Sequence, residues 1–222
     1  MHKFINMVKS LSVWESKKFL ERYGIKFVTS ELVREVDEAI RFAKRVGFPI
    51  VAKVSSPDVI HKTDVGGIVT NIQDEIELTH ALLTIHKNVK AKVPNARVEG
   101  IILQKMVKGI EVIVGGIVDP TFGSCVSFGS GGIFTEVYQD VSFRVTPLTR
   151  KDALEMIKET KVYKVLKGFR NLPKANIRSL VDLLIKVSDL MEENKEVMEL
   201  DLNPVFVTPK ESLVADARII VE

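Results

Sequence analysis

The chain has 222 residues, of which 45% are hydrophobic and 27% are charged, and its formal net charge is +3. These proportions describe a globular protein with a substantial core. The small charge excess suits an anionic ligand but is too weak and too dispersed to indicate nucleic-acid binding. No apolar run reaches the ~18 residues that a membrane helix needs, and the amino-terminal segment lacks the apolar core of a signal peptide. The single cysteine, Cys125, excludes an internal disulfide. We therefore expect a cytoplasmic protein.

Helices and strands alternate in the first part of the chain. Ser12 and Glu15 have the spacing of a capping box, which predicts a helix that ends at Gly24. Hydrophobic patterning and Gly/Pro signals predict the elements that follow. They are a strand at 26–28, a helix at 36–46, strands at 48–54 and 68–72, and a helix at 74–92.

The rest of the chain begins with a long run of predicted strands, from residue 98 to residue 145, separated by turn signals such as Asp119-Pro120. Two helices and two strands follow, at 150–166, 177–193, 199–207 and 213–217. This order predicts an α+β fold whose mixed or antiparallel sheets lie in two lobes. It does not favour one continuous parallel sheet.

Lys53 is the first residue that points to chemistry. Alternation along its strand places Lys53 on one face and Ala52 and Val54 on the other. An ammonium group in such a segment has to reach water or an anion. Lys53 is either an edge lysine that extends to solvent or a phosphate ligand.

The loop 55–67 combines a histidine with a pair of glycines. Gly66 and Gly67 allow the backbone to approach a ligand closely and to present successive N–H groups to an anion, although ordinary turns use the same pair. A neutral imidazole at His61 can accept a phosphoryl group near pH 7. A solvated surface histidine would have the same sequence context.

Two further segments are ambiguous when each is taken alone. Gln104 ends a predicted strand, Met106 and Val107 form a connector, and Glu111 lies in the next strand. A purine site needs backbone donors and acceptors between apolar side chains, which this connector provides, but an ordinary hairpin fits as well. The glycine-rich segment 128–136 is typical of a phosphate cover or of a tight bend, and it lacks the Gly-Lys-Ser/Thr of a Walker loop.

Polar side chains alternate along the predicted strand 199–207. Glu199 and Asn203 share one face of that strand, and Asp216 lies on the expected partner strand. Carboxylate and amide oxygens that converge across a hairpin form a site of the kind that Mg²⁺ prefers. A solvated polar face is the alternative.

Together and in this order, these stretches resemble the ATP-grasp family, and within it the β subunit of ADP-forming acetyl-CoA synthetases. The matching stretches are GFPIVAKVSSPDVIHKTDVGGI, LQKMVKGIEVIVG, FGSGGIFTEVYQDVSFRVTPL, and ELDLNPV followed by VADARI. They span most of the chain. The resemblance implies an ATP-grasp fold in which two α/β subdomains, approximately 26–97 and 1–25 plus 98–222, enclose a nucleotide cleft.

The resemblance also implies roles for individual residues. His61 would be a phosphohistidine that passes a phosphoryl group between a histidine of a partner subunit and ADP. The residues implied for ATP or ADP are Lys53 at the phosphates, the Gly66-Gly67 turn above them, Gln104, Met106 and Val107 at adenine, and Glu111 at the ribose. Those implied for Mg²⁺ are Asn203 and Asp216, with Glu199 as a further candidate.

The implied partner is a CoA-binding α subunit that carries its own phosphohistidine, in an α2β2 heterotetramer. This partner would bind acyl-CoA and phosphate, and neither nucleic acid nor membrane is expected. The β subunit of succinyl-CoA synthetase is also similar, but it continues into a further domain, whereas this chain ends six residues after Asp216. It also has no histidine that corresponds to His61. A stand-alone ATP-grasp carboxylate ligase and a nucleotide-sensing module are the alternative functions.

Overall fold

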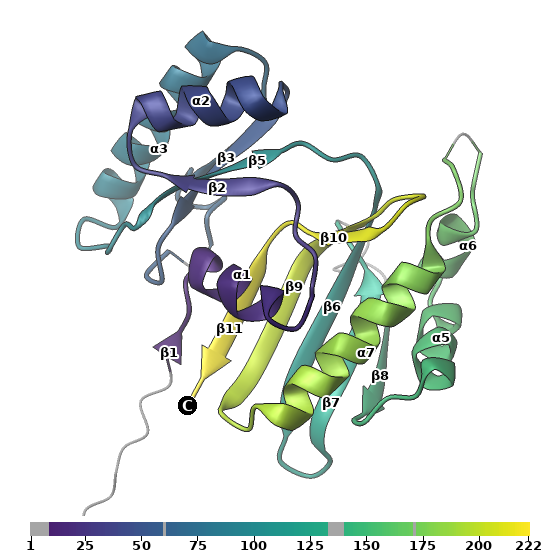
Figure 1. Ribbon diagram of the computed structural model, residues 1–222. Helices are drawn as coiled ribbons and strands as arrows, with labels where there is room; N and C mark the ends of the chain where they lie inside the picture. The colour runs from purple at the N-terminus through teal and green to yellow at the C-terminus, as the bar shows by residue number, and fades with distance from the viewer. Residues whose placement is uncertain (1–8, 60, 133–139, 171) are drawn as a thin grey trace, which may run out of the picture. The chain divides into compact units, whose positions relative to one another are not determined.

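The computed structural model describes residues 9–59, 61–132, 140–170 and 172–222 (Figure 1). The chain divides into two compact units. The small unit contains residues 12–15 and 28–107, and the large unit contains residues up to 11, 16–27 and 108–222. The expected division lay at 97/98, but strand β5 (Gly100–Lys105) belongs to the small unit because it pairs with β2 and β3 of that unit.

The small unit is a four-stranded antiparallel sheet with two helices packed on one face (Figure 1). Its strands lie in the order β2 (Ser30–Val33), β5, β3 (Ile50–Ser55) and β4 (Ile68–Ile72), and its helices are α2 (Val36–Val46) and α3 (Glu75–Lys92). Asp74 caps α3, since its carboxylate accepts the N–H groups of Ile76 and Glu77 at 2.9 and 2.8 Å.

The core of the small unit lies between the sheet and these helices. Phe42 of α2 and Leu78 of α3 are fully buried there, against Ile50 and Leu103 of the sheet. Each large buried side chain of this kind contributes roughly 1.5–3 kcal/mol by leaving water. The face of the sheet toward the helices is therefore occupied by core side chains. Polar side chains of the sheet have only the opposite face available.

The large unit is a seven-stranded antiparallel sheet with helices packed on one face (Figure 1). The order is β1-β11-β9-β6-β7-β8, with β10 beside β9. Its strands are β1 (Lys9–Ser10), β6 (Ile110–Asp119), β7 (Gly123–Ser130), β8 (Val141–Val145), β9 (Val197–Val207), β10 (Ser212–Val214) and β11 (Ala217–Val221). Its helices are α5 (Arg150–Glu159), α6 (Val162–Leu166), α7 (Ile177–Glu193) and most of α1 (Val13–Glu21).

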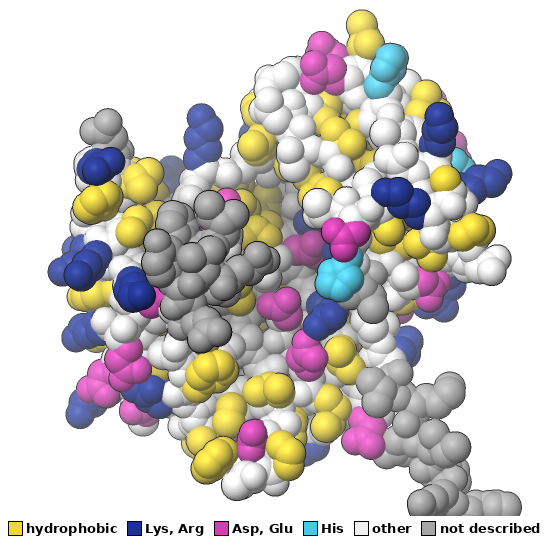
Figure 2. Space-filling view, turned by 180° about the vertical axis from the view of Figure 1, so that it is seen from behind, with side chains coloured by type: hydrophobic (Ala, Val, Ile, Leu, Met, Phe, Trp, Pro, Cys, Tyr) yellow, Lys and Arg dark blue, Asp and Glu magenta, His cyan; other side chains and the backbone are white. Residues whose placement is uncertain are grey.

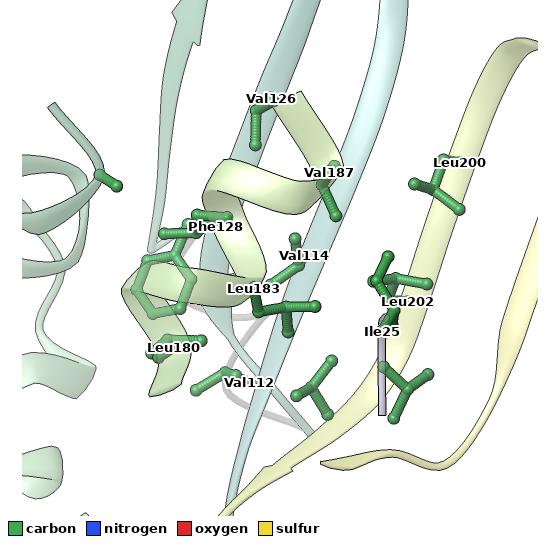
Figure 3. Close-up of a cluster of buried hydrophobic side chains, with 14 of the residues drawn as sticks. Ile25, Val112, Val114, Val126, Phe128, Leu180, Leu183, Val187, Leu200 and Leu202 are labelled. Carbon is green, nitrogen blue, oxygen red and sulfur yellow. The ribbon is translucent and has the colours of Figure 1, made fainter. Parts of the chain in front are cut away.

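Helix α7 supplies one side of the core of the large unit (Figure 3). Leu180 and Val187 of α7 are fully buried, as are Val114 of β6 and Phe128 of β7. The strands place alternate residues on this face. The other face of the sheet keeps the polar residues of β9, which include Glu199 and Asn203.

The structure confirms the α+β class and several predicted elements. The helices at 36–46 and 177–193 and the strand at 68–72 have the expected bounds. The strand expected at 26–28 is a single bridge between Phe27 and Val214, and β2 was not predicted. Part of the strand run expected up to residue 145 lies outside the described residues.

One predicted helix, at 150–166, is two helices. Thr160 ends α5, and its hydroxyl donates to the carbonyl of Ile157 at 2.8 Å. The buried carboxylate of Asp140 then accepts the N–H groups of Lys161 and Val162 at 2.7 and 3.1 Å. These N–H groups therefore bond to a side chain from outside the helix, and α6 starts as a separate element.

Basic and acidic side chains are interspersed over the face drawn in Figure 2, in keeping with the small net charge. Among the described helices, none has the length and apolar character needed to cross a membrane.

Candidate functional site

Lys53 and Gln104 lie on the same face of the small sheet, opposite α2 and α3. Lys53 is opposite Ile102 in the sheet, and Gln104 is opposite Val51. Their strand neighbours Ala52 and Leu103 belong to the core on the other face, as the alternation predicted. Lys53 is only 3% exposed and Gln104 only 5%. Burial makes a charged ammonium strongly dependent on nearby polar or anionic groups, which suits a phosphate ligand better than an edge lysine in solvent.

His61 is exposed at the start of a compact turn. Inside the turn, the N–H of Gly66 donates to the carbonyl of Thr63 at 3.0 Å, and the N–H of Gly67 donates to that of Lys62 at 2.7 Å. Gly66 has φ of +66°, in the left-handed region that favours glycine. The turn therefore holds the imidazole at the surface on a locally closed backbone.

Gly67 fixes the turn to strand β3. The N–H of Val54 donates to the carbonyl of Gly67 at 2.8 Å, and a Cβ at position 67 would lie 2.8 Å from Val54 Cγ1. A side chain at Gly67 would therefore push the turn away from the strand. The next residue, Ile68, is opposite Lys53 in the sheet. The turn therefore leads directly into the strand that pairs with β3 at Lys53.

Helix α3 holds the other side of the same turn. The side-chain amide of Asn88 donates to the carbonyl of Gly66 at 3.1 Å, and the ammonium of Lys92 donates to that of Asp64 at 2.7 Å. A Cβ on Gly66 would lie 2.6 Å from Asn88 Nδ2. Sequence reasoning missed both helix residues. Asn88 and Gly66 are 22 residues apart, and no local pattern links a helix asparagine to a distant turn.

The connector after β5 is held by backbone contacts within the small unit. Met106 donates its N–H to the carbonyl of Pro49 at 3.2 Å, and Lys105 donates its own to that of Thr29 at 2.9 Å. These two N–H groups are occupied. If the connector binds a purine base, the backbone donor has to come from Val107 or from a later residue.

In the large unit, Glu111 lies beside the glycines that follow β7. The N–H of Gly131 donates to the carbonyl of Glu111 at 3.0 Å. A Cβ at Gly131 would lie 2.8 Å from the carbonyl carbon of Glu111, so the close approach requires glycine. The end of the glycine-rich segment, from residue 133 on, lies outside the described residues.

Asn203 and Asp216 lie directly opposite each other. The N–H of Asn203 donates to the carbonyl of Asp216 at 3.1 Å, and the N–H of Ala215 donates to that of Pro204 at 2.9 Å. The expected strand 213–217 is interrupted here, so Asp216 lies in the short gap between β10 and β11. On the other side of β9, residues 203–204 face the single residue Ile113 in a β-bulge. This bulge is a local irregularity of the kind that re-aims side chains.

Glu199 has a different environment. Its carboxylate accepts from the guanidinium of Arg218 on β11. Arg218 itself is opposite Asp201 in the sheet. An ion pair with arginine uses carboxylate oxygens that a metal ion would otherwise bind, so the contacts of Glu199 favour a structural role.

Two adjoining pockets, of about 450 and 390 Å³, lie in the small unit against α3. They share His86, Val98 and Ile101, and neither is lined by Lys53 or Gln104. Their volume alone therefore does not mark them as the site of the predicted chemistry.

Comparison with known proteins assigns the family. The sequence matches the ATP-grasp domain family over residues 6–221. It is 44% identical over 207 residues to the β subunit of the ADP-forming acetate–CoA ligase I of Pyrococcus furiosus, which covers 93% of this chain and 89% of the relative. The chain belongs to the family of ADP-forming acetate–CoA ligase β subunits. The resemblance found in the sequence is thereby confirmed.

Solved structures of the same family support the fold. Acetyl-coenzyme A synthetase 1 of Ca. Korarchaeum cryptofilum, in complex with coenzyme A and Ca-AMPCP, is 46% identical and has a TM-score of 0.92, covering 96% of this chain and 94% of that one. A second structure of that enzyme contains coenzyme A and Mg-AMPPCP, with a phosphohistidine segment pointing towards the nucleotide-binding site. It is 42% identical with a TM-score of 0.83 and covers 96% and 93% of the two chains. The predicted ATP-grasp fold is confirmed.

Proposed function

We propose that this ligase β subunit transfers a phosphoryl group between a phosphohistidine and ADP, with His61 as the relay. One observation carries the proposal. An exposed imidazole begins a glycine turn whose following strand residue, Ile68, is opposite the buried Lys53 in the sheet. This arrangement supports a phosphoryl acceptor at His61 with a stabilising positive charge on the adjoining strand β3.

The relay consists of two balanced displacements. A neutral ring nitrogen of His61 attacks the phosphorus of the partner's phosphohistidine, so that the new P–N bond replaces the one to the partner. A terminal oxygen of ADP then attacks the same phosphorus, which forms the P–O bond of ATP and releases neutral His61. The complete reaction is acyl-CoA + ADP + phosphate = acid + ATP + CoA. Lys53 would stabilise the negative charge during transfer.

Asn203 and Asp216 would hold Mg²⁺ in this proposal. An amide and a carboxylate oxygen suit this ion, which also keeps waters and phosphate oxygens, and the backbone bond between the two residues fixes their separation. An ion held there would supply positive charge that offsets the charge of the phosphate oxygens. Glu199 is left out because Arg218 already binds its carboxylate.

The nucleotide would use the remaining predicted residues. Gly66 and Gly67 would face its phosphates, Gln104 and the Met106-Val107 connector its adenine, and Glu111 its ribose. Gln104 is buried on the same sheet face as Lys53, which supports a common ligand for the two.

A partner completes the reaction. The P. furiosus relative is named as a β subunit, and the Korarchaeum enzyme binds coenzyme A and has a phosphohistidine segment. We propose a cytoplasmic α2β2 complex in which the α subunit binds acyl-CoA and phosphate and brings its own phosphohistidine to His61.

His61→Ala tests the relay against a matched variant, His80→Ala, because His80 is exposed on α3. The α subunit, acetyl-CoA and labelled phosphate are mixed with each β subunit and ADP. Transfer of label to ATP should fall at least 1,000-fold in His61→Ala, because the covalent relay is removed, and should be unchanged in His80→Ala. Equal transfer by wild type and His61→Ala would refute the relay.

The same assay separates the alternatives. A stand-alone ATP-grasp carboxylate ligase would turn over without the α subunit and form no acid-labile phosphohistidine. A nucleotide sensor would bind ATP with no transfer of label.

A further inference from the structure

We propose that Asn88, assisted by Lys92, is a positioning residue for His61, and this inference rests on the function proposed above. The two side chains extend from α3 to the turn that begins at His61, and they bind its backbone at Gly66 and Asp64. Neither side chain touches the imidazole in any described contact. They would act on phosphoryl transfer by holding the turn.

The hydrogen bonds of the turn show why α3 matters. The carbonyls of Lys62 and Thr63 accept N–H groups from within the turn, and the carbonyl of Gly67 accepts from β3. Those of Asp64 and Gly66 accept from Lys92 and Asn88 on α3. Without these two donors, the turn keeps its internal bonds and the packing of Val65 against the core, but it loses its hydrogen bonds to the helix. It would then be free to pivot about its junction with β3.

Asn88 also packs closely against Gly66. Position 66 has φ of +66°, and a Cβ there would lie 2.6 Å from Asn88 Nδ2. The amide therefore packs directly on the glycine as well as bonding to its carbonyl. A hydrogen bond combined with close packing defines one position of the turn, whereas a surface lysine bonding to a carbonyl constrains it less. We assign the larger effect to Asn88.

The phosphoryl relay needs such a constraint. His61 has to meet a donor histidine and an ADP oxygen in succession, and each displacement requires the reacting atoms to align. An exposed turn is the part of a fold that opens most easily. Side chains from a long, capped helix bind the backbone of the turn at Gly66 and Asp64.

The first test is Asn88→Asp, which keeps the shape of the side chain but replaces the N–H donor with an acceptor facing the Gly66 carbonyl. Its control is Thr84→Ala, an exposed neutral truncation on the same helix. In the complete α–β complex, kcat for label transfer to ATP should fall about tenfold to a hundredfold. The affinity for ADP, measured by calorimetry, should fall less than kcat does, because Lys53 and Gln104 are untouched and only the turn is altered.

A spectroscopic readout distinguishes positioning from general destabilisation. In ¹H–¹³C spectra of the imidazoles, the His61 resonance, identified by its loss in His61→Ala, should shift or broaden in Asn88→Asp while that of His80 stays in place. Lys92→Met should lower kcat about threefold, against no change for Lys87→Met, an exposed lysine on the same helix. This second pair also carries the test if Asn88→Asp folds poorly.

The outcomes separate the two proposals. If His61→Ala is inactive while Asn88→Asp and Lys92→Met transfer phosphate at the wild-type rate, the positioning role is wrong and the relay stands. A parallel loss of ADP affinity and of kcat in Asn88→Asp would also overturn positioning, since the turn would then act through nucleotide binding. If His61→Ala is fully active, the relay itself fails.

Discussion

The two units hold their candidate residues in different ways. In the large unit, a backbone hydrogen bond joins Asn203 of β9 to Asp216, which lies in the gap between β10 and β11. In the small unit, His61 begins an exposed turn that is attached through Val54 on one side and through Asn88 on the other. Residues proposed to bind an ion are thus held by the backbone of the sheet or of the short gap beside it. The residue proposed to react with two successive partners is at the surface.

The largest effect that separates the two regions is expected in the large unit. Asp216→Asn removes the carboxylate proposed for Mg²⁺, and transfer of label to ATP should fall ~100-fold or more at low Mg²⁺ because much of the charge stabilisation is lost. Raising the Mg²⁺ concentration should restore part of the rate. The control is Asp189→Asn, an exposed change on α7. A rate that does not depend on Mg²⁺ in either variant would remove Asp216 from the site.

An intermediate effect is expected for the small sheet. Lys53→Met should weaken ADP binding about tenfold to a hundredfold, since the buried charge that we propose to face the phosphates is lost. Folding should be retained, because a buried ammonium is replaced by an apolar side chain of similar length. Calorimetry with Lys87→Met as control measures the change. Wild-type affinity in Lys53→Met would exclude the assigned phosphate contact.

The smallest effect is expected on stability, when the N-terminal cap of one helix in each unit is removed. Asp74 caps α3, and Thr149 caps α5 by accepting the N–H of Asp152 at 3.2 Å. Replacing either residue with alanine should lower the free energy of unfolding by about 1 kcal/mol. Because each unit has its own core, amide exchange should accelerate in the small unit for Asp74→Ala and in the large unit for Thr149→Ala. Identical exchange changes in both variants would show that the units open together.

The fold was largely predictable because local chemistry agreed with the final packing. The helices at 36–46 and 177–193 have strong apolar periodicity and clear ends, and the structure confirms their predicted bounds. The division of the predicted helix 150–166 was not predictable, because it depends on the Asp140 carboxylate reaching two N–H groups from another element. That β5 belongs to the small unit depends likewise on its pairing with β2 and β3. The sequence around β5 does not indicate which strands it pairs with.

The candidate site was predictable in its residue types and less so in its contacts. The strand alternation at Lys53 correctly separated the core face from the other face. The Arg218 pair of Glu199 and the Asn88 contact with Gly66 are tertiary. Sequence spacing contains no information about either. The assigned roles of Lys53, His61, Asn203 and Asp216 remain predictions that the experiments above test.

Strand β9 has a consequence for the order in which the protein loses its function. It is eleven residues long and hydrogen-bonded to β6 on one side and to β10 and β11 on the other. Backbone groups paired on both sides are released only when much of the sheet opens. Gradual heating or denaturant should therefore disorder the turn at His61 first, while the strand that contains Asn203 keeps its structure until the large unit unfolds.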